Sequence, residues 1–357
     1  MTAIGAPHVG SMEARTRDIE DVAVAGGDRA VHRWLVATAV CVVVALVVGG
    51  ITRLTESGLS ITEWRPVSGV VPPLSETDWT SAFEAYRQIP EAQTVHRGIT
   101  LAAFKALYWW EWVHRILARL VGLVIAVPFF VLLMRRQIRP ALQLRLANLP
   151  ILVAAQGVLG WYMVQSGLSG RTDVSPYRLV AHLGVALMIY LIATWTAMTL
   201  RAHTRAVDRL GVAVAVLAGI TILSGGFVAG LDAGHVYNEF PLMGSAIVPA
   251  EYGAMGVWWR DWFENPVSAQ FNHRVLAVTT LVVAFGAWWV RGVRGSEVAL
   301  RAWRWVAAAA ALQVALGIAT LLLLVPIPLA ALHQVGALGV LTAGMFAAVN
   351  GHRTVTY

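Results

Sequence analysis

Charged residues are scarce in this sequence. Asp, Glu, Lys and Arg make up 13% of its 357 residues, while 57% of the residues are hydrophobic. Soluble globular domains carry roughly 25% charged residues. A water-soluble globule of this size needs more polar surface, and a disordered chain has fewer apolar residues. The scarcity of charge therefore excludes both classes and predicts a protein that crosses a membrane several times.

Cysteine is almost absent as well. Cys41 is the only one, and it lies inside an apolar run. An internal disulfide and a metal site built from cysteines are therefore excluded, and we interpret Cys41 as a small buried apolar residue. The net charge is +7, which in a soluble domain would suggest nucleic-acid binding. Here we attribute it to arginine-rich cytoplasmic loops and expect no nucleic-acid partner.

The apolar residues form eight runs long enough to cross a bilayer, which takes about 20 helical residues each. Pro326 and Pro328 separate the last two runs, because proline interrupts a helix. The fold class predicted is all-α, a polytopic membrane protein of eight transmembrane helices. The runs are at roughly 33–51, 112–134, 146–165, 178–200, 209–231, 271–290, 303–325 and 329–349.

Charges in the connections predict the orientation, because cytoplasmic loops are enriched in Lys and Arg. Arginines cluster after the second, fourth and sixth runs, whereas the loop 232–270 carries five acidic residues and one arginine. We therefore expect both termini in the cytoplasm of a bacterium, whose inner membrane the protein spans, and the loops 52–111 and 232–270 outside. A mitochondrial inner membrane is the alternative. Residues 1–30 lack an apolar core and contain five acidic residues, so we expect a disordered cytoplasmic tail rather than a targeting signal.

The first outer loop, 52–111, is too long to be a plain connection. It is rich in Trp, Tyr and Phe, and residues 75–86 show an amphipathic pattern that begins at a possible helix cap, Ser75 or Thr77. We expect a folded cap that rests on the outer membrane surface.

The two halves of the sequence resemble each other. Four short matches occur in the same order in both, which indicates two pseudo-symmetric four-helix bundles that arose by duplication. We assign residues 31–205 to the first bundle and 206–357 to the second. The matches pair Gly49-Gly50 with Gly225-Gly226, His114-Arg115 with His273-Arg274, Gln156 with Gln313, and His182 with His333.

Four histidines lie within the predicted spans, two in each half and all near the outer surface. They are His114, His182, His273 and His333. Ionisable residues inside spans usually face a functional interior, although a single one is often just a hydrogen bond between helices. One pair in each four-helix bundle is the arrangement for axial ligation of a haem iron. Zinc is less favoured, because neither half offers a convincing third ligand.

Charged neighbours accompany the first histidine of each half. Arg115 and Arg274 directly follow it, and they either pair with haem propionates or anchor the helix at the interface. Glu111 lies three residues before His114 and shares its helix face, whereas the second half has Gln270 at that position. This difference predicts that one haem site performs proton chemistry and the other transfers electrons. Alternatively, Glu111 is a rim residue paired with Arg115 or Arg119.

With these residues taken together, the sequence resembles the haem A synthases of the mitochondrial and alphaproteobacterial branch. That branch lacks the cysteine pair found in the first outer loop of other members, as this chain does. The resemblance covers nearly all of the chain from about residue 33. It rests on the segments 49–60, 111–115, 177–182, 228–234, 237–244, 263–266, 271–274 and 328–334.

The resemblance implies an oxidoreductase that converts the C8 methyl group of haem O to a formyl group. The product is haem A, which cytochrome oxidase requires. Successive hydroxylations of the methyl group and loss of water would give the formyl group, with Glu111 as the catalytic carboxylate. The substrate haem would lie between His114 and His182, and a haem b cofactor between His273 and His333.

The same resemblance implies partners: haem O synthase as the source of substrate, an electron donor such as ferredoxin, and cytochrome oxidase assembly factors. Membrane lipid surrounds the protein. Association of the protein with further copies of itself, as a homo-oligomer, is also expected. The residues leave two other classes open. A di-haem b-type electron-transfer protein would share the four histidines but would not need Glu111. A transporter would also have duplicated bundles, but would not need histidines near the outer rim.

Overall fold

The computed structural model describes residues 9–168, 172–202, 206–292 and 296–350. In these ranges eight helices are long and apolar enough to cross a membrane, which confirms the predicted fold class. They are α1 (Val9–Leu54), α4 (Leu101–Met134), α5 (Pro140–Leu168), α6 (Pro176–Arg201), α7 (Arg209–Gly230), α9 (Pro266–Ala287), α10 (Glu297–Leu322) and α11 (Ile327–Asn350).

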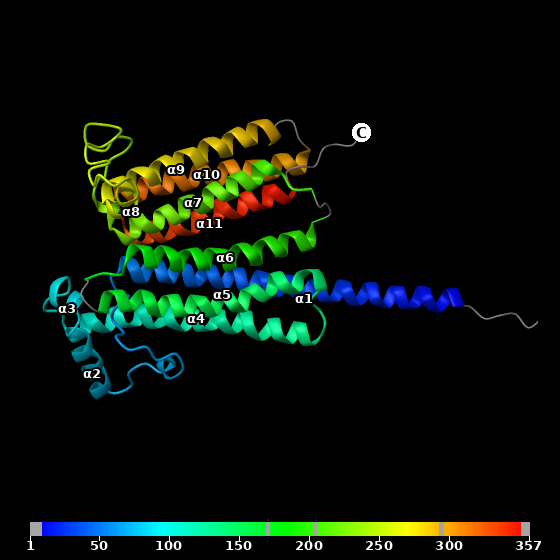
Figure 1. Ribbon diagram of the computed structural model, residues 1–357, viewed down its shortest axis with the longest axis horizontal. Coiled ribbons are helices and arrows are strands. Elements are labelled where there is room, and N and C mark those ends of the chain that lie inside the picture. Colours follow the sequence, from blue (N-terminus) through cyan, green and yellow to red (C-terminus); the bar gives the residue numbers. More distant parts are fainter. Residues whose placement is uncertain (1–8, 169–171, 203–205, 293–295, 351–357) are drawn as a thin grey trace, which may run out of the picture.

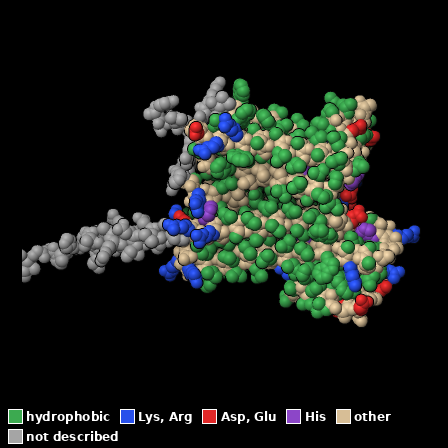
Figure 2. Space-filling view, turned by 180° about the vertical axis from the view of Figure 1, so that it is seen from behind, with side chains coloured by type: hydrophobic (Ala, Val, Ile, Leu, Met, Phe, Trp, Pro, Cys, Tyr) green, Lys and Arg blue, Asp and Glu red, His purple; other side chains and the backbone are tan. Residues whose placement is uncertain are grey.

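The spanning helices pack as two groups of four (Figure 1). Helices α1, α4, α5 and α6 contact one another, as do α7, α9, α10 and α11, and the two groups meet where α6 and α1 lie against α7 and α11. Hydrophobic side chains cover the sides of the molecule, and most charged side chains gather at its two ends (Figure 2). The exact boundary expected between the two bundles stays a prediction, since residues 203–205 lie outside the described ranges.

The spanning helices begin earlier than most of the apolar runs predict, and the difference is largest for α1 and α4. Helix α4 begins at Leu101, capped by the Thr100 side chain, which accepts a hydrogen bond from the Ala103 backbone. Its first turns leave the predicted span and pack Phe104 and Tyr108 into the outer cap. Helix α1 begins at Val9, where we expected a disordered tail. No proline interrupts this segment, so the helix continues without a steric break. The part of α1 long and apolar enough to span a membrane begins at Gly27.

The first outer loop is folded, as expected. It contains η1 (Ser68–Val70), α2 (Glu76–Arg87) and α3 (Pro90–Thr94). Ser75 and Asp78 form a reciprocal capping box at the start of α2, and hydrogen bonds from the Ser75 backbone and side chain lower the pKa of Asp78. Trp79 and Tyr86 are buried against α4 residues in a separate apolar core. The prediction of a short amphipathic helix capped at Ser75 is therefore confirmed.

The second outer loop is ordered around a buried carboxylate. It contains η2 (Ala233–His235) and α8 (Trp258–Glu264). Asp261 on α8 accepts hydrogen bonds from the Ser268 hydroxyl, the Asn265 amide and the backbone N–H groups of Gly253 and Met255. Burial would raise the pKa of Asp261, but these hydrogen bonds outweigh it and lower the pKa. The carboxylate thus fixes the loop to the start of α9.

Candidate functional site

The four span histidines lie on the four helices that begin at the outer loops. His114 is on α4, His182 on α6, His273 on α9 and His333 on α11. His182, His273 and His333 lie within the first two turns of their helices, and His114 lies near the predicted start of its membrane span. The structure therefore places one histidine pair in each group of four helices, toward the same end of the molecule.

Each of these imidazoles lies against a glycine of a neighbouring helix. A Cβ added to Gly49 would lie 2.7 Å from Cε1 of His114, and one added to Gly317 would lie 2.8 Å from Cε1 of His333. The corresponding distances are 3.1 Å for Gly225 and His273, and 3.3 Å for Gly160 and His182. Real Cβ atoms almost never approach within 3.0 Å. The glycines therefore provide the space in which the four rings lie.

These contacts follow the internal repeat. Gly49 on α1 and Gly225 on α7, the first helix of each half, correspond in the repeat. Gly160 and Gly317 also correspond, because each lies four residues after the matched Gln156 or Gln313. The glutamines correspond as well. The amide of Gln156 donates to the carbonyl oxygen of His182 at 3.0 Å, and that of Gln313 donates to the carbonyl oxygen of His333 at 2.9 Å. The repeat seen in the sequence is thus a repeat of the histidine environment.

The second pair is spaced to hold one metal ion between two rings. The ring centroids of His273 and His333 are 6.4 Å apart, with the planes at 80°. Metal–imidazole nitrogen bonds of about 2 Å on opposite sides of an ion would put the two centroids about 6 Å apart. Nδ1 of His273 lies 3.3 Å from the Ser224 hydroxyl, and Nδ1 of His333 lies 3.1 Å from the Gln313 amide. The Ser224 hydroxyl can accept a hydrogen bond from the second ring nitrogen of His273, as is typical of histidines that ligate metals, whereas the Gln313 amide nitrogen is a donor.

The first pair has unpartnered ring nitrogens. Nδ1 of His114 and Nδ1 of His182 are buried and have no hydrogen-bond partner among the described residues. Buried polar atoms normally have one. Two such nitrogens, each on a ring against a glycine, fit a site that is completed by a bound group. In both halves the donor set is a pair of imidazole nitrogens. The described residues contain no cluster of three metal-binding side chains, which suits a haem better than a bare ion.

Glu111 is held by four donors in the first half. It is 2% exposed. Its Oε2 accepts hydrogen bonds from the Ser60 hydroxyl at 2.8 Å and the Ile61 backbone N–H at 2.7 Å. Its Oε1 accepts from Nε and Nη2 of Arg115 at 3.0 and 2.7 Å. The sequence left open whether Glu111 pairs with an arginine; it pairs with Arg115, and both carboxylate oxygens are fixed in orientation.

The corresponding position in the second half bonds differently. Gln270 is 3% exposed, and its amide donates to the carbonyl oxygen of Tyr237 at 3.0 Å. Nη2 of Arg274 donates to the same oxygen at 2.9 Å, while the buried Nε of Arg274 has no partner among the described residues. The second half therefore has no carboxylate at this position, and its arginine retains a free donor.

Arg115 and Arg274 attach the outer loops to their helices. Arg115 donates to the backbone carbonyls of Ile61 and Glu63 at 2.8 and 2.9 Å, and Arg274 donates to that of Leu242 at 3.2 Å in addition to Tyr237. These loop contacts were not foreseen. Ser60 and Ile61 were missed as well, because nothing in a sequence indicates that a loop serine lies over a carboxylate fifty residues later.

The two sites lie on either side of one helix. Gly49 on α1 faces His114, while a Cβ on the adjacent Gly50 would lie 2.0 Å from Oε1 of Gln334, the residue after His333. A side chain at position 50 would have to displace the end of the Gln334 side chain. The glycine pair therefore contacts a histidine of one half and the neighbour of a histidine of the other.

Fold and site together define an α-helical integral membrane protein with one partly buried histidine pair in each of two related four-helix halves. The chain belongs to the family of cytochrome oxidase assembly proteins, whose pattern it matches over residues 32–345. Among its relatives is a protein named heme A synthase from Parvibaculum lavamentivorans, 46% identical over 314 residues, which are 87% of this chain and 90% of the relative.

Two more relatives have the same name. The protein from Rhodospirillum centenum is 48% identical over 322 residues, covering 88% of this chain and 86% of the relative. The one from Nitrosospira multiformis is 43% identical over 324 residues, covering 88% and 91%. The resemblance indicated by the sequence motifs is confirmed.

Proposed function

We propose that this protein is a haem A synthase, an oxidoreductase that converts the C8 methyl group of haem O to the formyl group of haem A. The observation that carries the proposal is the buried carboxylate of Glu111 one helical turn before His114, with Gln270 at the equivalent position. Relatives named heme A synthase, 43–48% identical over most of their length, support it. A di-haem electron-transfer protein would have no use for this difference between its halves.

His114 and His182 hold the iron of the substrate, haem O, in the first half. Gly49 and Gly160 leave room for their rings, and the unpartnered Nδ1 atoms support a bound group there. His273 and His333 hold a haem b cofactor in the second half, and their 6.4 Å separation supports this assignment. A haem b held there would supply one-electron transfer between the substrate site and a donor.

Glu111 is the catalytic residue. Arg115, Ser60 and the Ile61 backbone prevent its carboxylate from rotating, so its charge stays on the helix face that it shares with His114. In that position it accepts a proton or stabilises positive charge that develops at the porphyrin edge. Preorganised charge of this kind is worth more in a buried site than in water.

The two arginines are proposed to face haem propionates as well as the loops. Arg274 supports this best, because its Nε is a buried donor without a partner and guanidinium groups suit carboxylates. Arg115 is mostly occupied by Glu111 and the loop carbonyls, so its main contribution is to position Glu111.

The arrangement in the cell follows from the same proposal. Both termini lie in the cytoplasm and the histidines toward the outer face of the bacterial inner membrane in this proposal, which the basic connections support. Haem O synthase supplies the substrate, a small electron carrier such as ferredoxin reduces the protein, and assembly factors pass haem A to cytochrome oxidase. The protein is also proposed to form homo-oligomers.

The test is to purify the protein and identify its pigments by chromatography. Haem b together with haem O or haem A is expected, whereas haem b alone would support electron transfer and no haem would support transport. Glu111→Gln should retain haem but form no haem A, because the amide cannot accept the proton or carry the charge. Glu63→Gln, which changes an exposed carboxylate near the same loop, should form haem A normally. Normal haem A formation by Glu111→Gln would refute the assignment.

A further inference from the structure

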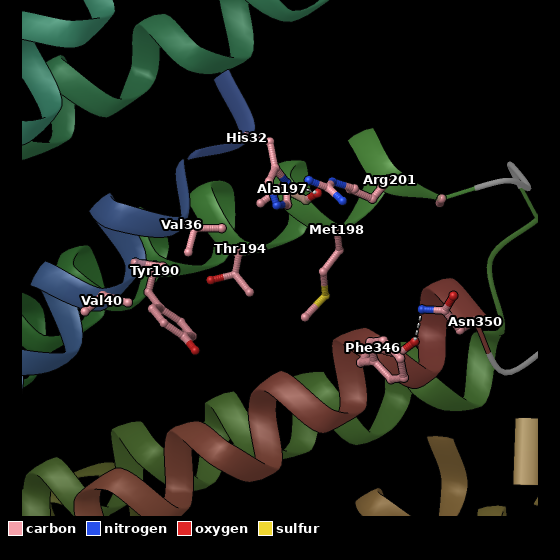
Figure 3. Close-up of a pocket in the computed structure, with 12 residues that line it drawn as sticks. His32, Val36, Val40, Tyr190, Thr194, Ala197, Met198, Arg201, Phe346 and Asn350 are labelled. Atoms are coloured by element: carbon pink, nitrogen blue, oxygen red, sulfur yellow. Dashed lines mark hydrogen bonds between the residues drawn. The ribbon is translucent and has the colours of Figure 1, made fainter. Parts of the chain in front are cut away.

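A cavity of about 580 Å³ lies between the two halves. Helices α1, α6 and α11 line it, and Figure 3 shows their side chains around it. It is separate from the histidine sites, since Tyr190, the residue on its wall nearest to His182 along α6, is eight residues beyond it, or about 12 Å along the helix. Its volume is within the usual range for small-molecule sites, about 300–1,000 Å³.

The walls of the cavity are mostly apolar, and its charged residues are basic. Val36, Met198 and Phe346 supply apolar surface. Among the described residues that line the cavity, the ionisable side chains are His32, Tyr190 and Arg201, with no carboxylate. Arg201 forms no hydrogen bond or ion pair within the described part of the chain. The Nδ1 of His32 donates to the carbonyl oxygen of Ala197 at 3.1 Å, so the neutral ring presents Nε2 as an acceptor and Arg201 is the group that attracts an anion. The cavity is therefore complementary to an anion attached to an apolar chain.

A buried polar atom also points to a ligand. The hydroxyl oxygen of Thr194, a residue 8% exposed, is buried without a hydrogen-bond partner, and Figure 3 shows this side chain among those that surround the cavity. An isolated buried hydroxyl is unfavourable by about 1–3 kcal/mol. A rotation of this side chain toward the cavity would let an ester or phosphate oxygen accept its hydrogen bond.

We propose that this cavity binds one anionic phospholipid from the cytoplasmic leaflet, between the two halves of the protein. Arg201 holds the phosphate, and an acyl chain lies against Val36, Met198 and Phe346. Basic pockets between spanning helices at the cytoplasmic surface commonly recognise anionic headgroups, and Arg201 ends α6 at the arginine-rich end of the molecule. A lipid here would contact α1 and α6 of one half and α11 of the other, and so stabilise their association.

The experiment is a thermal-unfolding titration of the purified, delipidated full-length protein in detergent. Phosphatidylglycerol should raise the unfolding temperature and saturate, whereas phosphatidylcholine and inorganic phosphate should not. Arg201→Gln should raise the half-saturating phosphatidylglycerol concentration about tenfold. Ala197→Phe, which fills the cavity from a buried wall position, should abolish the effect. Arg209→Gln is the matched control, because this arginine begins the neighbouring helix α7 and does not line the cavity.

Three results would overturn the proposal. Equal stabilisation by phosphatidylcholine would show that the headgroup charge is not recognised. Equal weakening by Arg209→Gln would show that general surface charge is responsible, and stabilisation by phosphate alone would assign the site to a free anion. Because Arg201 is an exposed residue at a helix end, its variant keeps the test decisive even if Ala197→Phe fails to fold.

Discussion

The glycines that face the four histidines allow a graded test of the haem sites. An alanine at Gly49 or Gly317 puts a methyl group 2.7 or 2.8 Å from the Cε1 of its histidine, so the ring must move. At Gly225 and Gly160 the distances are 3.1 and 3.3 Å, which a shift of a few tenths of an ångström relieves. Gly157 on α5 is the control, because nothing lies within 4 Å of an added Cβ there.

The expected size of the effect follows from the cost of overpacking. An extra methyl group in a packed interior costs about 1–3 kcal/mol, and about 1.4 kcal/mol changes an equilibrium tenfold. If the ring is displaced from the position that binds iron, Gly49→Ala should weaken haem binding in the first half by about five- to a hundredfold. Gly317→Ala should do the same in the second half, and Gly160→Ala and Gly225→Ala should change binding less than fivefold.

The assay is the haem content and visible spectrum of each purified variant, with chromatography to distinguish haem b from haem O and haem A. Gly49→Ala should lose haem O and haem A and keep haem b, whereas Gly317→Ala should lose haem b. Gly157→Ala should keep both, with a slightly more stable helix because alanine has the higher helix propensity. The reasoning is refuted if Gly49→Ala and Gly317→Ala bind as much haem as Gly157→Ala. It is also refuted if the loss of haem among the four variants does not increase as the distance from the added Cβ to the histidine Cε1 decreases.

Two further predictions concern the outer side of the protein. Ser60→Ala removes the hydroxyl that donates to Glu111. The variant should keep its haem but form haem A about tenfold more slowly, since such a bond to a charged group is worth about 1.5–3 kcal/mol; Ser60→Thr should restore the rate, and failure of rescue would contradict a positioning role. Burial raises the pKa of Glu91 in the cap from 4.5 to about 8. Between pH 4.5 and about 8, Glu91 therefore keeps its proton in the folded cap and loses it in the unfolded cap. Cap stability should therefore be full below about pH 4.5 and fall as the pH rises through 8, measured by hydrogen exchange in α2 and α3. Glu91→Gln should remove most of this slope, and a cap that gains stability with rising pH would contradict the reasoning.

Much of the architecture could be predicted from the sequence because membrane insertion imposes one-dimensional rules. A span needs a long apolar run, and in this chain such runs coincide with helices. The internal repeat was visible for a similar reason, since duplicated helices keep the residues that contact the histidines. Helix ends were less predictable. Helix α4 extends beyond its apolar run because its first turns pack Phe104 and Tyr108 into the cap, a tertiary contact that hydropathy does not report.

The sequence by itself determined the eight spans, the two related halves and the identity of the four histidines and Glu111. Scarcity of charge made this possible, because a polar residue retained in so apolar a chain stands out. Only the tertiary structure decided how these residues are arranged. Ser60 reaches Glu111 across fifty residues of folded loop, and Gly50 admits Gln334 from the other half. The cavity beside Arg201 is formed by helices from both halves. Such contacts depend on how helices distant in sequence pack in space, and no local pattern of residues encodes them.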